Sequence, residues 1–256
     1  MAARKPLVTS LLEDLGASVA SAAGTIPAAP ALASSNGFPG QSGPAPASPL
    51  LGSLNLTPLA TSGEQFQTEI SATVTIGGQL FILSSGGGST LQVTNATNPA
   101  APALLERVTY GGGYVSQSVA TFGNLVAVAL SPADYSTSGG NGLVRFYRLA
   151  ADGSLTLIAD VEVGYLPDGL AFNEQGTKLV IANEGEPAAG YTLDRPGSIG
   201  IIDIQGRAGQ ERFSYTDLGF ADVTLPDGIR ISGPAGTTQA NDIEPEYVTV
   251  LGNYAY

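Results

Sequence analysis

The chain of 256 residues has 22 acidic and 10 basic side chains, a formal net charge of −12 and a pI near 4.2, although only 12% of its residues are charged. This charge repels phosphate backbones and anionic membrane surfaces, so we expect no nucleic-acid partner. The sequence has no His and no Cys. Their absence excludes imidazole and thiol catalysis, disulfides and zinc–thiolate sites, so any catalysis must use carboxylates, hydroxyls, Arg, Lys or a bound metal.

The N-terminal segment combines two kinds of sequence. Residues 1–16 begin with positive charge, as a secretory signal does, but Glu13 and Asp14 interrupt the apolar stretch. A short amphipathic helix, a disordered arm and a cleaved signal all remain open for this arm. Residues 17–53 are rich in Ala, Pro, Ser and Gly, which predicts a linker, because such a segment buries too little apolar surface to fold. No apolar run approaches the ~20 residues of a membrane span.

A hairpin pattern recurs from residue 54 onward. Each unit has an apolar strand, a turn that contains Gly or Asn, and a second apolar strand, as a β-hairpin requires. The four hairpins are predicted at 68–85, 115–130, 166–184 and 244–256. Third strands are predicted at 89–95, 142–150 and 197–205, and fourth strands at 103–110, 155–163 and 212–220.

The spacing of these units indicates a propeller. The second strands begin near residues 79, 124, 178 and 253, and the first intervals are close to the ~40 to 50 residues of a propeller blade. The longer last interval predicts insertions. We therefore predict an all-β fold, a β-propeller of four-stranded antiparallel blades with about three and a half blades over residues 54–256. A β-sandwich is the alternative, but it does not predict self-similar units.

The number of units predicts an incomplete propeller, since closed propellers have about four to eight blades. The chain is then either a fragment of a longer protein or a chain that closes with another one. Unpaired strand edges and uncovered blade faces would favour self-association or a partner chain.

Acidic residues gather where the predicted strands begin or end. Asp168 precedes the first strand of the third unit, and Glu244 and Glu246 precede that of the fourth. First strands line the channel of a propeller, so these acids are predicted to reach one mouth. The predicted metal ligands are Asp168, Asn183, Glu184, Glu186, Asp194, Asp242, Glu244 and Glu246.

The chemistry of these residues favours a hard cation. Ca²⁺ accepts six to eight oxygen ligands from carboxylates, amide oxygens and backbone carbonyls, and another divalent metal remains open. The alternative is that the acids only accept backbone hydrogen bonds in turns or lie solvated on loops. Arg195 and Arg230 are predicted to hold a substrate phosphate, with surface salt bridging as the alternative.

Three segments resemble one known family. "LPDGLAFNEQGTKLVIANEGEP", "YTLDRPGSIGIIDI" and "ANDIEPEYVTVLGNYAY" closely resemble the choice-of-anchor I family of secreted bacterial propeller-like proteins, some of which are labelled atypical alkaline phosphatases. The resemblance implies an extracellular or cell-surface propeller linked to calcium, with phosphoesterase activity. It also implies that the acids named above, with Asn183, are rim positions of a metal-dependent site.

Two hypotheses of function follow. In the first, the chain is a metal-dependent phosphomonoesterase that acts on a phosphate ester and uses metal-bound water as nucleophile. In the second, it is a non-catalytic propeller for surface display, adhesion or assembly. Members of the resembled family run on for several more blades and usually carry an export signal. We therefore expect a truncated member that is inactive by itself.

Overall fold

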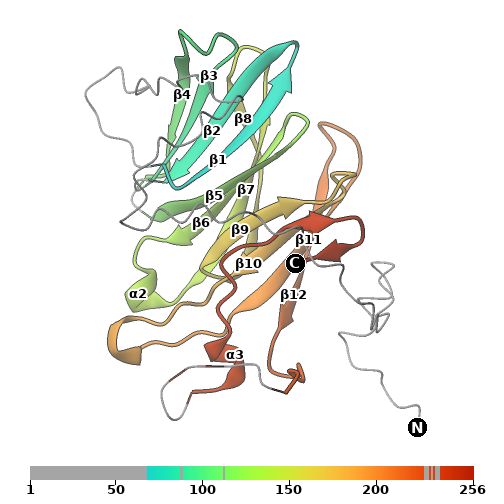
Figure 1. Cartoon of the computed structure of the whole chain (residues 1–256). Coiled ribbons are helices and arrows are strands. Elements are labelled where there is room, and N and C mark those ends of the chain that lie inside the picture. Colours follow the sequence, from blue (N-terminus) through green and yellow to red (C-terminus); the bar gives the residue numbers. More distant parts are fainter. Residues whose placement is uncertain (1–67, 87–88, 112, 228–230, 232, 234–236) are drawn as a thin grey trace, which may run out of the picture.

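The computed structural model describes residues 68–86, 89–111, 113–227, 231, 233 and 237–256. Within these residues, three four-stranded antiparallel sheets and a two-stranded hairpin follow one another (Figure 1). The same residues contain two short α-helices and one short 3-10 helix, which lie in the loops. None of the helices in this part of the chain is long and apolar enough to cross a membrane.

Each sheet is a simple meander in which sequential strands are hydrogen-bonded neighbours. Blade 1 contains β1 (Ile70–Ile76), β2 (Gln79–Gly86), β3 (Thr90–Asn95) and β4 (Ala103–Thr109). Blade 2 contains β5 (Tyr114–Phe122), β6 (Leu125–Pro132), β7 (Asn141–Leu149) and β8 (Leu155–Tyr165), with α2 (Tyr135–Ser138) after β6. Blade 3 contains β9 (Pro167–Phe172), β10 (Lys178–Asn183), β11 (Ser198–Gln205) and β12 (Arg212–Gly219), with the 3-10 helix η1 (Ala189–Tyr191) after β10. Then follow α3 (Gln239–Asp242) and the hairpin of β13 (Val250–Leu251) and β14 (Tyr254–Ala255).

Turn chemistry sets the register of these sheets. The turn between β1 and β2 consists of Gly77 and Gly78, which both have positive φ. A two-residue hairpin turn of type I′ requires positive φ at both positions, and glycine adopts it without steric cost. Along β1 the side chains alternate between exposed and partly buried, as expected for a strand with one face toward a core.

The hydrophobic core lies between the blades. One cluster packs blade 1 against blade 2 and includes Phe81, Leu83, Val126 and Leu130. A second cluster packs blade 2 against blade 3 and includes Phe146, where the rings of Phe146 and Phe213 stack with centroids 4.3 Å apart. Each sheet thus buries its faces against its neighbours, which is the packing that defines a propeller.

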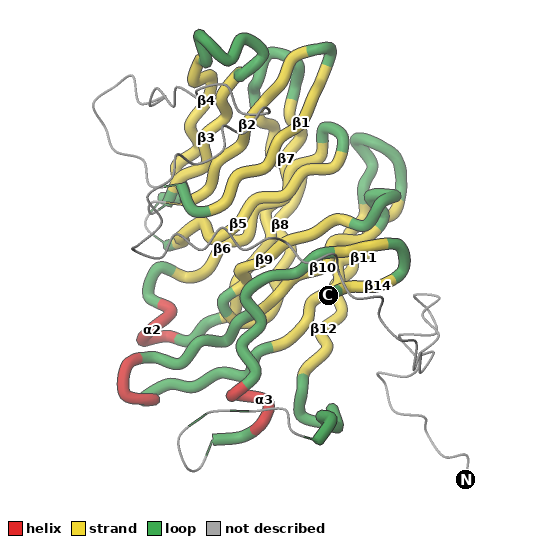
Figure 2. The backbone as a smooth tube through the Cα atoms, in the orientation of Figure 1, coloured by secondary structure: helices red, strands yellow, loops and turns green. Residues whose placement is uncertain are grey.

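The first strand of each blade is the innermost one. β1 contacts β5, and β5 contacts β9, so the first strands of the three blades lie beside one another (Figure 2). The entry points of these strands therefore meet at one end of the arrangement. This placement determines which side chains can form a common site.

The prediction of an all-β propeller with four-stranded antiparallel blades is confirmed. Every predicted strand segment contains an observed strand, and the long interval before the last hairpin contains α3 and its flanking loops. The sheets that the structure describes do not close into a ring. The predicted arm 1–16, the linker 17–53 and the propeller start at residue 54 lie outside the described residues.

Candidate cation site

One pocket of about 360 Å³ is lined by side chains that lie in or next to the first strands of the three blades and the first strand of the last hairpin. Glu69 precedes β1, Gln117 lies in β5, Asp168 lies in β9 and Glu246 precedes β13. We call this cavity the acidic pocket. It is lined by Glu69, Gln117, Tyr135, Leu166, Asp168, Glu184, Glu186, Glu246 and Tyr247.

Irregular pairing turns two of these side chains toward the mouth. Ser116 and Ser118 of β5 pair with the consecutive residues Leu130 and Ala129, so Gln117 is an extra residue in the strand. The pairing of β9 with β10 has the same kind of shift beside Asp168. A β-bulge of this type bends the strand and redirects a side chain, and bulges are frequent next to functional sites.

Glycines allow the segment that carries Glu246 to approach blade 3. A Cβ atom at Gly169 would lie 2.6 Å from the carbonyl oxygen of Glu246 and 2.9 Å from Cα of Tyr247. A Cβ atom at Gly197 would likewise collide with the carbonyl oxygen of Ile243. Only residues without side chains permit this backbone contact, which brings Glu246 to the wall that holds Asp168.

A strained turn connects Asp168 to the loop of Glu184. Leu166 has a φ of 49°, and it is buried with 7% of its surface exposed. The carbonyl oxygen of Leu166 accepts a hydrogen bond from the backbone N–H of Glu184 at 2.9 Å, and that of Tyr165 accepts one from Gly185 at 3.1 Å. Positive φ at a non-glycine residue costs on the order of 1 to 3 kcal/mol and persists only where its surroundings hold it. The two backbone hydrogen bonds therefore hold the strained turn and fix the spacing between the two acidic segments.

The carboxylates of the acidic pocket destabilise one another's charge. Burial, together with the neighbouring carboxylates of Glu69 and Glu246, raises the pKa of Asp168 to about 6. Burial and the carboxylates of Glu186, Asp168, Glu246 and Glu244 raise the pKa of Glu184 to about 7. Both shifts favour the protonated form, because removing a charge from water and placing it beside like charges are both unfavourable.

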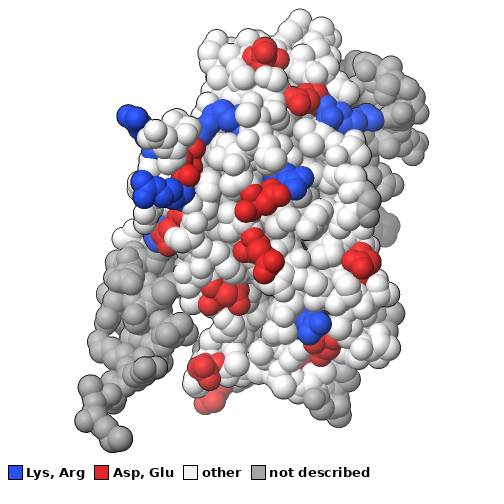
Figure 3. Space-filling view, turned by 180° about the vertical axis from the view of Figure 1, so that it is seen from behind, with Lys and Arg blue, Asp and Glu red and all other residues white. Residues whose placement is uncertain are grey.

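No lysine or arginine is among the described residues that line this pocket. Elsewhere acidic side chains have basic partners, as in the two-bonded pair of Arg145 with Asp160. Figure 3 shows several acidic side chains beside basic ones on the face turned away from the view of Figure 1. The acidic pocket thus concentrates negative charge without a basic residue in its wall.

The wall of the acidic pocket also holds an unpartnered hydroxyl. Tyr135 of α2 is 8% exposed, and within the described part of the chain its hydroxyl oxygen is buried without a hydrogen-bond partner. Burial is the main cause that raises the pKa of Tyr135, and Glu184 and Glu186 add to it, so the phenol stays protonated. A buried donor without an acceptor costs free energy, and a ligand oxygen in the pocket would remove that cost.

The predicted ligand set divides into separate places. Asp168, Glu184, Glu186 and Glu246 line the acidic pocket. Glu244 lies near the acidic pocket. Burial is the main cause that raises its pKa, and the charges of neighbouring acids, Glu186 first and Asp194 among the others, add to the shift. Asp242 also contributes to that shift from the last position of α3. A carboxylate oxygen of Asp194 is buried without a hydrogen-bond partner among the described residues.

Asn183 belongs to a different environment. It is fully buried at the end of β10, and its side-chain amide donates to the hydroxyls of Ser198 at 3.0 Å and Tyr215 at 3.2 Å. Strand alternation explains this, since consecutive residues face opposite sides of a sheet and the next residue, Glu184, lines the acidic pocket.

Of the two arginines predicted to hold a phosphate, the structure describes only Arg195. Arg195 donates from Nε to the carbonyl oxygen of Gly139 at 3.1 Å, and its guanidinium lies over the ring of Tyr165, 5.2 Å from the centroid. These contacts hold the guanidinium to blade 2. Arg230 lies outside the described residues.

The donors of the acidic pocket suit a hard cation, because carboxylates and the Gln117 amide present oxygen and no nitrogen or sulfur base. Among the described residues, however, no group of three or more acidic side chains lies close enough together to hold a metal ion. With the side chains in these positions, a cation would therefore meet fewer than three of the pocket's carboxylates and would complete its shell with other oxygens.

Sequence reasoning missed Glu69, Gln117 and Tyr135. A signal existed for the first two, because Glu69 and Gln117 stand at the entrances of the first strands of their units, as Asp168 and Glu246 do. Tyr135 had no comparable signal, since its loop reaches the pocket only through the packing of α2 beside β6.

Comparison with known proteins places the chain in a family. No functionally curated protein matches it. A crystal structure of a functionally unknown protein from Desulfotomaculum acetoxidans DSM 771 is 18% identical, with a TM-score of 0.38, over 60% of this chain and 45% of that chain. This chain therefore spans less than half of that protein. The sequence profile of the choice-of-anchor I domain matches residues 69–256, and the chain accordingly belongs to this family of surface-associated extracellular domains.

Proposed function

We propose that the chain is a surface propeller domain that binds a divalent cation, Ca²⁺ in the first place, in the acidic pocket. The observation that carries this proposal is the convergence of Asp168, Glu184 and Glu246 on one cavity whose described lining has no basic side chain. A bound cation would offset the repulsion that raises the pKa values of Asp168 and Glu184. Oxygen donors from several loops match the irregular coordination of Ca²⁺.

Calorimetric titration with Ca²⁺ tests the proposal. We expect saturable Ca²⁺ binding at pH 7.5. The affinity should fall at least tenfold in Asp168→Asn, because this variant loses a charged ligand. Binding should also weaken at pH 5.5, where protons compete for Asp168 and Glu184. Asp217→Asn, which lies in another pocket, is the matched control and should bind normally. Absence of binding by Ca²⁺, Mg²⁺ and Mn²⁺ would overturn the proposal.

A phosphoesterase activity is the second function that we propose, and the unpartnered hydroxyl of Tyr135 supports it. A bound cation would supply positive charge to an otherwise repulsive pocket and assist the activation of water. Tyr135 could donate its hydroxyl proton in a hydrogen bond to a phosphate oxygen. In this second function Asp168 and Glu246 hold the cation, which leaves Glu184 to accept a proton from the attacking water and to return it to the leaving alcohol.

Hydrolysis of p-nitrophenyl phosphate in the presence of Ca²⁺ tests this second function. We expect activity that is lost on chelation and strongly reduced in Glu184→Gln, because the amide cannot accept a proton. Tyr135→Phe should lower kcat/KM by about tenfold, the usual effect of one lost hydrogen bond to a charged group. Cation binding without any hydrolysis would instead support the non-catalytic surface or assembly function.

Association through the last hairpin is a further proposal. Leu251 and Tyr256 are 67% and 70% exposed, and the rings of Tyr254 and Tyr256 lie 6.4 Å apart. Exposed apolar side chains on a short two-stranded sheet favour contact with another chain or a second copy. Light scattering coupled to gel filtration should show a larger species that is lost in Leu251→Lys. A monomer at all concentrations would exclude self-association.

A further inference from the structure

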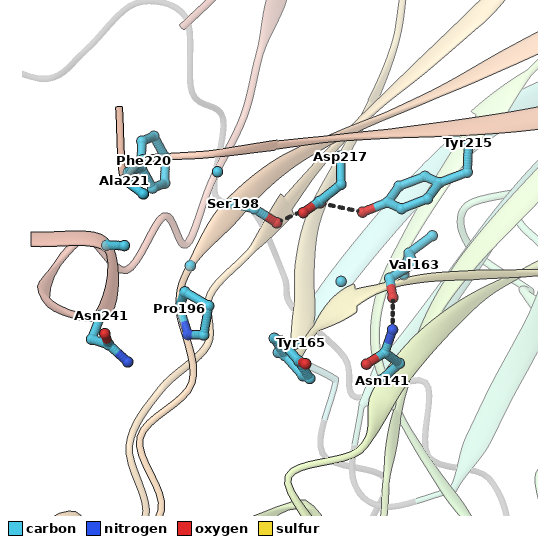
Figure 4. Close-up of a pocket in the computed structure, with 14 residues that line it drawn as sticks. Asn141, Val163, Tyr165, Pro196, Ser198, Tyr215, Asp217, Phe220, Ala221 and Asn241 are labelled. Carbon is cyan, nitrogen blue, oxygen red and sulfur yellow. Dashed lines mark hydrogen bonds between the residues drawn. The ribbon is translucent and has the colours of Figure 1, made fainter. Parts of the chain in front are cut away.

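A second cavity of about 410 Å³ opens between blades 2 and 3, and we call it the interblade pocket. Blade 2 contributes residues of β7 and β8, blade 3 contributes residues of β11 and β12, and α3 closes one side (Figure 4). Its volume lies within the range of small-molecule sites. Its lining includes Val163, Tyr165, Pro196, Ser198, Tyr215, Asp217 and Phe220.

A single carboxylate is held rigidly in this pocket. The Oδ1 atom of Asp217 accepts hydrogen bonds from the hydroxyl of Ser198 at 2.7 Å and from the hydroxyl of Tyr215 at 2.6 Å. Figure 4 shows both hydroxyls directed at this carboxylate. Both hydroxyls in turn accept from the buried amide of Asn183, at 3.0 and 3.2 Å. The network fixes the carboxylate before any ligand arrives.

The second oxygen of Asp217 is available to a ligand. No hydrogen bond from the described residues reaches Oδ2, and Asp217 is an exposed residue. A carboxylate oxygen only accepts hydrogen bonds at neutral pH, so the ligand group that meets it must be a donor. Because Oδ1 is already occupied, Oδ2 is the acceptor that Asp217 offers to a ligand.

Glycines make room for this network and for the cavity. A Cβ atom at Gly164 would lie 2.6 Å from the side-chain amide of Asn183, and one at Gly200 would lie 2.7 Å from the ring of Tyr215. Gly164 also lines the pocket. Any larger residue at either position would displace the polar groups, so the network depends on these two glycines.

The remaining wall combines apolar side chains with the amides of Asn141 and Asn241. Val163, Tyr165, Pro196 and Phe220 present rings and aliphatic carbon to the cavity. The guanidinium of Arg195 packs on the ring of Tyr165 and holds it in place. No lysine or arginine is among the lining residues that the structure describes, and Asp217 is their one charged side chain. An anionic ligand is therefore disfavoured by charge.

We propose that the interblade pocket binds a neutral sugar unit of a glycan. A pyranose ring presents hydroxyl donors at its edge, which Asp217 Oδ2 can accept, and a face of C–H groups that packs on aromatic and proline rings. The combination of one fixed carboxylate with apolar walls matches both features. This site is separate from the acidic pocket, and it does not depend on a cation there.

Saturation-transfer NMR on the full chain tests the proposal with four probes, the methyl glycosides of glucose, galactose, mannose and N-acetylglucosamine. We expect at least one probe to receive saturation at its ring protons. Its Kd should rise about tenfold in Asp217→Asn, which keeps the shape and removes the charged acceptor. Phe220→Ala is a second variant that removes the apolar contact without touching the hydrogen-bonded network, and it should also weaken binding.

Two controls separate this proposal from cation binding. Glu184→Gln and added chelator should leave the sugar signal unchanged, since both act on the acidic pocket. A signal abolished by either would place the sugar at the acidic pocket and overturn the proposal. It would also be overturned if none of the four probes received saturation, or if both Asp217→Asn and Phe220→Ala bound as the unaltered chain does.

Discussion

The two pockets of this domain differ in how their carboxylates are stabilised. In the interblade pocket one carboxylate, that of Asp217, has two hydroxyl donors within 2.7 Å. In the acidic pocket, Asp168 and Glu184 are half-buried among like charges, and their pKa values are raised to about 6 and about 7. A satisfied charge stabilises the fold, whereas a concentration of unsatisfied charge stores free energy that a ligand can release. The difference separates a preorganised acceptor from a site that awaits positive charge.

The largest effect on stability and Ca²⁺ affinity is expected when the segment that carries Glu246 is moved away from Asp168. In Gly169→Ala the added Cβ atom would lie 2.6 Å from the carbonyl oxygen of Glu246, so the segment must move away. We expect a loss of about 2 kcal/mol of stability and, in calorimetry, at least a tenfold loss of Ca²⁺ affinity. Gly219→Ala is the matched control, because nothing lies within 4 Å of its added Cβ atom and it lines only the interblade pocket. Equal effects of the two substitutions would contradict this account.

The pH dependence of stability should come from the acidic pocket. The folded protein keeps protons on Asp168 and Glu184 up to pH values of about 6 and 7, whereas the unfolded chain releases them near the ordinary carboxyl values of 3.8 and 4.5. The folded state therefore binds more protons in this window, and stability falls as pH rises through it. After a discount for solvent screening we expect about 2 kcal/mol, or a Tm about 5 °C higher at pH 5 than at pH 7.5 in chelator.

The variant Asp168→Asn/Glu184→Gln provides the control for this pH dependence. In this variant the Tm should differ less between pH 7.5 and pH 5, because the Asn and Gln side chains do not titrate. Tyr215 of the interblade pocket should not contribute, since burial and the Asp217 carboxylate raise its pKa further above its ordinary value of 10.0. A Tm that falls steadily from pH 7.5 to pH 5 would refute the electrostatic account.

Neutralising one carboxylate in each pocket should change the stability of the fold in opposite directions. At pH 7.5 without added cation, Asp168→Asn should raise the stability by about 1 kcal/mol, because it removes repulsion. Asp217→Asn should lower it by about 1 kcal/mol, because two hydrogen bonds lose their charged acceptor. Chemical denaturation measures both changes. The comparison fails if the two variants shift stability in the same direction.

The smallest effect is expected at Gln117, the neutral member of the four strand entrances. Gln117→Glu adds a sixth carboxylate to the lining of the acidic pocket and should lower stability by about 0.5 kcal/mol in chelator. With Ca²⁺ present, the same variant should bind about threefold more tightly, because it adds an anionic ligand. Paired thermal melts with and without Ca²⁺ measure the two effects. Weaker Ca²⁺ binding in this variant would show that residue 117 does not face the cation.

The blade structure was largely predictable because hairpin periodicity is a local property. The alternation in β1 and the Gly77–Gly78 turn can be read without knowledge of the partner sheet. The same holds for Asp168 and Glu246, whose positions beside strand entrances locate them at one end of the propeller. Local sequence thus indicated four residues of the acidic pocket's wall: Asp168, Glu184, Glu186 and Glu246.

The remaining features depend on packing between elements distant in sequence. The sequence predicts Asn183 at the rim, but one step of strand alternation places it in the interior with Ser198 and Tyr215. Arg195 lies on Tyr165 because the loop after β10 crosses to blade 2, which no local motif signals. The interblade pocket was not anticipated either, since its walls come from β7, β8, β11, β12 and α3.

The bulges in the innermost strands have a consequence for how such a domain can change over generations. Gln117 is an extra residue between Ser116 and Ser118, which are both buried, so it stands outside the alternation that packs the blade. Substitution there alters the chemistry of the mouth and leaves the inter-sheet core untouched. Asp168 occupies a similar irregularity in β9. Single mutations at these positions can therefore change which ligand the pocket prefers during evolution, while the packing of the blades stays the same.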